Sequence, residues 1–90
     1  MAKFHTIEIK RKHIKNGQPE DPWQCAIARA TRNHFDATRV TVAGEISIEG
    51  AAGQISDLKL KLTKRAFKFI DKFDNGEKVQ PTKMRFAEIG

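Results

Sequence analysis

The segment from Thr63 to Gly76 constrains the fold of this chain most, because it carries signals for both ends of a helix and one apolar stripe between them. The Thr63 hydroxyl can accept a hydrogen bond from a backbone N–H group of the first turn. Gly76 can adopt the left-handed conformation that closes a helix. The stripe consists of residues at helical spacing, namely Ala66, Phe69, Ile70 and Phe73. We therefore expect a helix here whose stripe packs on the core.

A second helix is predicted to begin at Asp21 and to run to about Phe35. Asp21 can cap it, Pro22 suits the first helical position, and Gln24 stands where a capping box places its glutamine. The residues expected to face the core are Trp23, Ile27, Ala30 and His34. Alanines at positions 26, 28 and 30 make this helix slim, so it can lie close to a sheet.

Five segments show the alternation of apolar and polar residues that is typical of strands with one buried face. They lie at 4–11, 40–42, 46–48, 58–62 and 82–89. The second and third form a hairpin, in which placing every apolar side chain inward requires Val42 opposite Ile46 and Val40 opposite Ile48. The last strand is expected at an edge of the sheet. The segment 12–17 could make one helical turn that ends at Asn16-Gly17, but the turn-rich segment 18–21 cannot continue it, so we interpret this stretch as a loop.

These elements predict one α+β domain over residues 1–90, with two helices on one face of a mostly antiparallel sheet. The order is strand, helix, three strands, helix, strand. A hydrophobic content of 39% with 31% charged residues is typical of soluble globular chains. The single cysteine excludes an internal disulfide, and there is neither a signal peptide nor an apolar run long enough for a bilayer. We expect a cytoplasmic protein.

Few residues are candidates for catalysis or metal binding. Cys25 lies near the start of the predicted helix, where the macrodipole favours a thiolate. His13 and His34 are possible bases, but His34 falls on the opposite side of that helix, so this pairing fails. We interpret Cys25 as a buried structural thiol. His5, His13, His34 and Cys25 show no spacing typical of a metal site. We therefore expect no catalytic residue, no metal and no cofactor.

The net charge of +6 favours an anionic partner, and the basic residues gather in two stretches. The first contains Lys3, Lys10, Arg11, Lys12 and Lys15 against Glu8 alone, and the second contains Lys59, Lys61, Lys64, Arg65, Lys68 and Lys72 against Asp71 alone. If the fold brings the two stretches together, they form one positive surface. If it does not, they are two solvated faces without a partner.

Two basic surfaces compete as the candidate binding site. The outward side of the sheet would carry Arg39, Thr41, Lys59, Lys61, Lys83 and Arg85. The exposed sides of the helices would carry Arg29, Arg32, Arg65, Lys68 and Lys72. Either surface could contact phosphates. The sheet has no outward aromatic residue apart from Phe4, so it is not expected to stack bases and read single-stranded RNA.

Two segments resemble a known group of proteins. They are Cys25-Ala26-Ile27-Ala28-Arg29-Ala30 and the run FIDKFDNG at 69–76, which is followed by Val79-Gln80-Pro81. They resemble small proteins of tailed phages and prophages that pair a C-P-I-A-x-A helix start with a late F-I-x-x-F-D-x-G-x-x-V-x-P segment. The group has no established activity, so the resemblance implies no site residue. It implies a phage-encoded or prophage-encoded accessory protein in the host cytoplasm.

In that context three functions are open. The first is a non-enzymatic protein that uses its basic surface to bind a host or defence-system factor, for example a nuclease complex with bound nucleic acid. The second is an accessory protein that binds DNA or RNA directly through phosphate contacts. A small enzyme is the least favoured. For the first two we expect a monomer or homodimer without membrane attachment.

Overall fold

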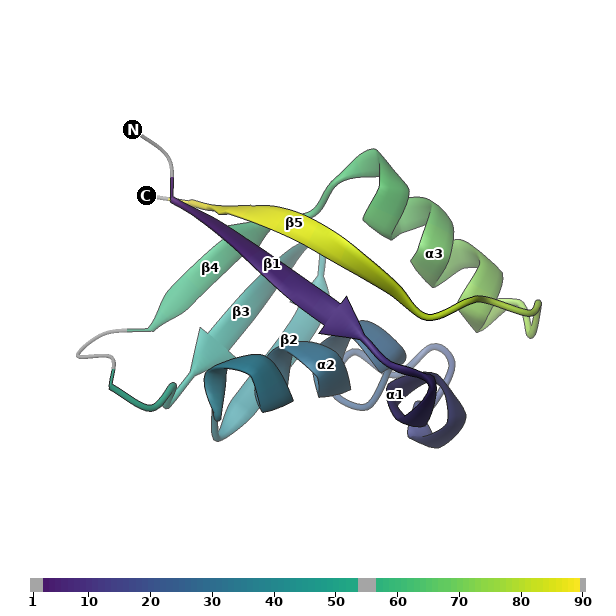
Figure 1. Ribbon diagram of the computed structural model, residues 1–90, viewed down its shortest axis with the longest axis horizontal. Helices are drawn as coiled ribbons and strands as arrows, with labels where there is room; N and C mark the ends of the chain where they lie inside the picture. Colours follow the sequence, from purple (N-terminus) through teal and green to yellow (C-terminus); the bar gives the residue numbers. More distant parts are fainter. Residues whose placement is uncertain (1–2, 54–56, 90) are drawn as a thin grey trace.

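A computed structural model of the chain describes residues 3–53 and 57–89 (Figure 1). The elements follow in the order β1 (Phe4–Ile9), α1 (Arg11–Asn16), α2 (Ala26–Phe35), β2 (Arg39–Ala43), β3 (Glu45–Glu49), β4 (Leu58–Lys61), α3 (Lys64–Asp74) and β5 (Thr82–Glu88). They form one small α+β domain, which is the fold class that the sequence predicts. In the part of the chain that the structure covers, no helix combines the length and apolar character needed to cross a membrane.

The strands form one antiparallel sheet in the order β1-β5-β4-β3-β2. The pairing between β4 and β5 is short, because only Leu60 with Glu88 and Lys61 with Ala87 are in register. Figure 1 shows the consequence: β1 and β5 run at a steep angle across the other three strands, so the sheet is curled. Its inner face holds the core, to which α2 and α3 contribute their buried residues.

The expectation that the last strand lies at an edge was wrong. β5 pairs with β1 on one side and with β4 on the other, and the edges are β1 and β2. The alternation around Met84 and Phe86 reports only that one face of the strand is buried, and both of these side chains are buried. It contains no information on how many neighbours the backbone has.

The β2–β3 hairpin has the predicted register. Val40 lies opposite Ile48 and Val42 lies opposite Ile46, and all four side chains are buried. Between the strands, Gly44 has a φ of 65°, a left-handed conformation that costs glycine little. The prediction succeeded because only this register puts all the apolar residues on one face.

The organising helix α3 is also confirmed. The Thr63 hydroxyl accepts a hydrogen bond from the Ala66 N–H at 3.1 Å. At the other end, Gly76 has a φ of 77° and its N–H donates to Phe73 O, while the next N–H donates to Lys72 O. These two bonds form a Schellman motif. Ala66, Phe69 and Phe73 are buried and Ile70 is half-buried.

Helix α2 begins at Ala26, five residues later than predicted from Asp21. Asp21 does act as a cap, since its Oδ1 accepts hydrogen bonds from the N–H groups of Trp23 and Gln24. That cap closes only a turn, because Cys25 is in an extended conformation with ψ at 166°. Trp23 therefore lies outside the helix and is 43% exposed, which corrects its assignment to the core.

Of the other three residues of this helix that were predicted to face the core, two are buried and one is exposed. Ile27 and Ala30 are buried as predicted, whereas His34 is exposed. Ala26 and Ala28 are also fully buried, because the slim helix contacts α1 as well as β1 and β2. A helix covered from two sides buries a wider arc than one apolar stripe predicts.

The segment that we interpreted as a loop contains a helix, α1. Its first turn is held by His13, whose Nδ1 accepts a hydrogen bond from the Lys10 N–H at 2.9 Å. The helix of six residues is too short to be stable alone, and it forms because it packs against α2. For that reason the sequence indicated at most one helical turn here, and the interpretation as a loop was wrong.

Candidate functional site

The predicted basic residues on the outer face of the sheet are exposed, but several face acidic residues. The register places Glu49 opposite Arg39 and Glu8 opposite Lys83. Glu45 lies opposite Lys61 and its Oε1 is also 3.4 Å from Lys59 Nζ. Cross-strand neighbours of opposite charge weaken the field that a distant anion meets. This face is therefore a mixed-charge surface.

Arg85, on the same face, contacts an aromatic ring. Its guanidinium carbon lies 4.0 Å from the centroid of the Phe4 ring, a cation–π arrangement. The only outward aromatic residue noted in the sequence is thus covered by an arginine and is not free to stack a base. The sheet is the weaker of the two candidate surfaces.

The predicted residues of α3 line a groove of about 370 Å³ between the helix and the segment 78–84. Arg65, Lys68 and Lys72 form one wall, and Lys78 joins them from the opposite side. Arg65 is held in place, because its guanidinium donates to Thr82 Oγ1 and, at 3.1 Å, to Lys83 O. Lys68 and Lys72 have no such bond among the described residues, so their ammonium groups are available to a ligand.

A second groove, of about 650 Å³, lies between α1 and the end of α3. Its basic residues are Arg11, Lys15 and Lys78, and its apolar lining includes Ile14, Phe73 and Val79. Among the described lining residues Glu77 is the one acid. The groove meets the first one at segment 78–80, which lines both.

We call the two grooves together the two-groove surface. Its basic residues are Arg11, Lys15, Lys78, Lys72, Lys68 and Arg65. All except Lys78 come from the two basic stretches of the sequence, so the fold brings part of each stretch to one surface. Arg11, Lys15 and Lys78 were not among the predicted site residues. The charge of the first stretch could have indicated two of them, but Lys78 joins only because the chain turns back after Gly76.

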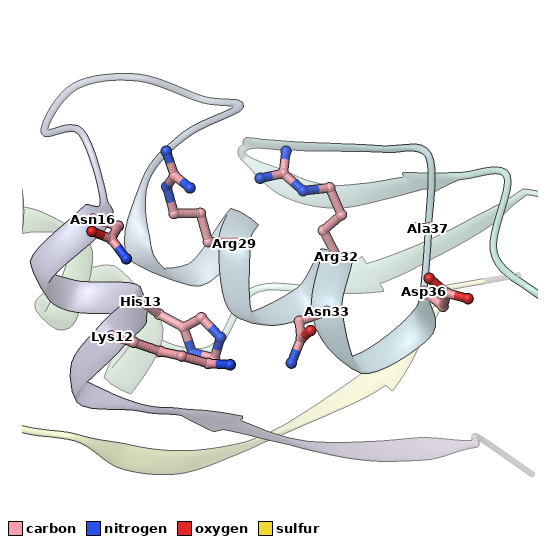
Figure 2. Close-up of a pocket in the computed structure, with 8 residues that line it drawn as sticks. All are labelled: Lys12, His13, Asn16, Arg29, Arg32, Asn33, Asp36 and Ala37. Atoms are coloured by element: carbon pink, nitrogen blue, oxygen red, sulfur yellow. The ribbon is translucent and has the colours of Figure 1, made fainter.

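Arg29 and Arg32, which were predicted to share a surface with the α3 residues, lie elsewhere. They line a pocket of about 350 Å³ between α1 and α2 (Figure 2). Its lining consists of Lys12, His13, Asn16, Arg29, Arg32, Asn33, Asp36 and Ala37. Helix α1 therefore serves both regions, with Lys12 and His13 at this pocket and Arg11 and Lys15 at the two-groove surface.

His13 is the buried titratable residue of this pocket, with 6% of its surface exposed. Burial lowers its pKa below the usual value of 6.5, and the positive charges of Lys12, Lys10 and Arg29 act in the same direction more strongly than Glu8 opposes them. The ring is therefore neutral near pH 7. Sequence reasoning considered His13 only as a metal ligand or base and did not place it in a pocket.

Cys25 is a buried thiol, as predicted, with 5% of its surface exposed. Burial raises the pKa of the thiol, although backbone hydrogen bonds from Ala28 and Ile27 act in the opposite direction. The thiolate needed for nucleophilic or redox chemistry is thus disfavoured. Within residues 3–53 and 57–89, no three His, Cys, Asp or Glu residues are grouped so that they could hold a metal ion.

Comparison of the chain with protein families, with curated proteins and with solved structures finds no match.

Proposed function

We propose that this chain is a small non-enzymatic accessory protein of the phage type that binds an acidic segment of a host or defence-system protein along the two-groove surface. The observation that carries the proposal is the combination of basic walls and an apolar lining in two grooves that meet at segment 78–80. The resemblance of segments 25–30 and 69–81 to phage proteins supplies the context. In that context the protein acts in the host cytoplasm, as a monomer or homodimer.

A protein segment matches this surface better than a nucleic-acid backbone does. Phosphates would pair with the cations but would leave the half-buried Ile14 and Val79 in contact with water. A segment that carries both carboxylates and aliphatic side chains would cover the cations and the apolar lining together. Apolar contact supplies most of the free energy of association, while charge pairing supplies orientation and speed. The factor that carries the segment can itself belong to a nucleic-acid-bound complex, such as a nuclease.

Direct binding of DNA or RNA is the second candidate, and one observation favours it. Arg65, Lys68 and Lys72 stand on one side of α3 and line the same groove. By the helical rise they form a strip about 10 Å long, which can meet successive phosphates. This mode would use the strip and would not need the apolar lining.

A capture experiment with nuclease treatment separates the two candidates. The purified protein is immobilised and exposed to host lysate with and without nuclease, beside the variant Lys68→Gln/Lys72→Gln/Lys78→Gln. Arg65 is left intact because it holds the start of β5. The control Lys59→Gln/Lys61→Gln/Lys83→Gln removes the same charge from the sheet. We expect a stoichiometric protein partner that survives nuclease, is kept by the control and is lost by the groove variant.

Two results would contradict the proposal. Recovery of the same protein by the groove variant would remove the two-groove surface from the mechanism. Recovery of nucleic acid alone, abolished by nuclease, would favour the second candidate. The variant Val79→Ser adds an independent measurement, since it should weaken binding of a protein partner severalfold and leave binding of a DNA duplex unchanged.

A further inference from the structure

The buried imidazole of His13 has one nitrogen without a partner. Its Nδ1 accepts the hydrogen bond from the Lys10 N–H, so in the neutral ring the hydrogen is carried by Nε2. Among the described residues no atom accepts a hydrogen bond from Nε2, although this nitrogen is buried. Buried polar groups of this kind are rare and call for an explanation, such as an absent ligand or water.

The unpartnered nitrogen belongs to a residue that lines the α1–α2 pocket. Figure 2 shows the His13 ring reaching from α1 toward α2, beside Lys12 and facing the side of Asn33. A small movement of the ring would therefore bring Nε2 within hydrogen-bonding distance of an acceptor oxygen on a ligand in this pocket. Water could fill the same place, but the charges around it favour an anion.

Three cations line the pocket, namely Lys12 from α1 and Arg29 and Arg32 from α2. Arg29 uses its Nε to donate to Gln24 O at 3.2 Å, which fixes the side chain and leaves its two terminal nitrogens to a ligand. In Figure 2 the guanidinium groups of Arg29 and Arg32 extend to the side of α2 away from His13 and Lys12. The two arginines therefore add positive charge around the pocket, while Lys12 is the cation that stands beside the His13 ring.

The remaining polar residues of the pocket indicate which class of ligand it can bind. Asn16 and Asn33 add amide donors, and Asp36 adds one carboxylate. In Figure 2 Asp36 lies away from His13, beyond Asn33, so an anion is favoured at the His13 side of the pocket. The volume of about 350 Å³ is near the small end of the roughly 300 to 1,000 Å³ of ligand pockets. It suits a small molecule and not a polymer.

We propose that the α1–α2 pocket binds a phosphate monoester or inorganic phosphate at its His13 side, with the Nε2–H of His13 donating to one phosphate oxygen, Lys12 pairing with the charge beside it, and Arg29 and Arg32 adding positive charge from across α2. A phosphate carries at least three acceptor oxygens and close to two negative charges, so it matches this many donors and cations better than a carboxylate with two oxygens and one charge. The site lies on the other side of α1 from the two-groove surface, so the phosphate site and the proposed function can be tested independently of each other.

The test follows the ring signals of the three histidines by NMR at constant ionic strength. The probes are inorganic phosphate, a nucleoside 5′-monophosphate and the same nucleoside without phosphate. We expect a saturable shift of the His13 signals with the first two probes and none with the nucleoside, while His5 and His34 serve as internal references. Equal affinity for the two phosphates would identify free phosphate as the source, and tighter binding of the monophosphate would identify a nucleotide.

Variants decide whether the pocket is responsible. Lys12→Gln/Arg32→Gln should weaken phosphate binding by about tenfold or more, since the ion pair with Lys12 and the positive charge of Arg32 are both lost. The matched control Lys59→Gln/Lys61→Gln removes the same charge from the sheet and should bind as the wild type does. His13→Gln should also weaken binding, and if it fails to fold the charge variant decides alone. An absent or non-saturable His13 shift, or equal binding by the charge variant and the wild type, would overturn the proposal.

Discussion

Gly17 lies directly against the ring of Phe73, far away in sequence: a Cβ added at Gly17 would come within 2.8 Å of Phe73 Cζ. It would also come within 2.8 Å of His13 O and 2.9 Å of Ala26 N. Residues of α1, α2 and α3 thus meet at this glycine. Two of the three close atoms belong to the backbone, which cannot move aside as the end of a side chain can.

Gly17→Ala should therefore destabilise the protein by about 1 to 3 kcal/mol, the usual cost of overpacking. The φ of Gly17 is −71°, which alanine adopts without strain. Where space allows, such a change stabilises a protein by about 0.4 to 1 kcal/mol through the unfolded state, so the sign of the effect is the test. Urea denaturation measures it, and a midpoint equal to or above that of the wild type would show that the three helices are not closely packed here.

Phe73→Ala should cost about 3 to 5 kcal/mol, because the ring is 7% exposed and packs against Phe69 with centroids 6.4 Å apart. The same helix offers a matched control. Phe67 is 49% exposed, so Phe67→Ala should cost less than about 1 kcal/mol. Chemical denaturation of both variants gives the comparison. Equal losses for the two would contradict the assignment of the buried face of α3.

Cys25 should react with thiol reagents only when the structure opens. Its burial and its raised pKa leave little thiolate at neutral pH. We expect labelling that is much slower than that of a free cysteine and that accelerates with sub-denaturing urea. Cys25→Ser should lower stability and leave partner binding by the folded protein unchanged. Rapid stoichiometric labelling under native conditions is the outcome that this interpretation does not allow.

His13 should make the protein less stable below pH 6.5. Its pKa is lowered in the folded state from the usual value of 6.5, so as the pH falls through that value the unfolded chain takes up a proton that the folded chain does not. Unfolding then becomes more favourable with falling pH, until the pH reaches the folded pKa of His13. Well above pH 6.5 the ring is neutral in both states and contributes no pH dependence.

Denaturation midpoints between pH 5.5 and 7.5 check this prediction, with His34→Gln as the control because His34 is exposed. The wild type and His34→Gln should both lose stability toward pH 5.5, and His13→Gln should lose less. If phosphate occupies the pocket, it should oppose the loss, since an anion beside Nε2 stabilises the protonated ring. An identical pH profile for His13→Gln and the wild type would mean that His13 does not carry the dependence.

Much of the fold could be predicted wherever neighbouring residues carry the signal. The ends of α3 were correct because Thr63 and Gly76 satisfy the backbone groups of their own helix. The β2–β3 register was predicted correctly because it is the pairing that places Val40, Val42 and their partners Ile48 and Ile46 together on the buried face. By contrast, Asp21 caps a turn and not α2. No local pattern distinguishes a capped turn from a capped helix, because the course of the chain after Gln24 depends on where α1 and β2 lie.

The sequence by itself determined the fold class, the stripe on α3, the hairpin register and the presence of two basic stretches. The tertiary structure alone decided that β5 lies inside the sheet, that α1 is a helix, and that Arg11 and Lys15 line a groove adjoining that of Lys72 while Arg29 and Arg32 line a separate pocket. The physical reason is the distance along the chain over which each interaction acts. Capping and alternation act over a few residues, whereas strand order, the contact of Gly17 with Phe73 and the burial of His13 depend on residues far apart in the chain, which only the folded backbone brings together.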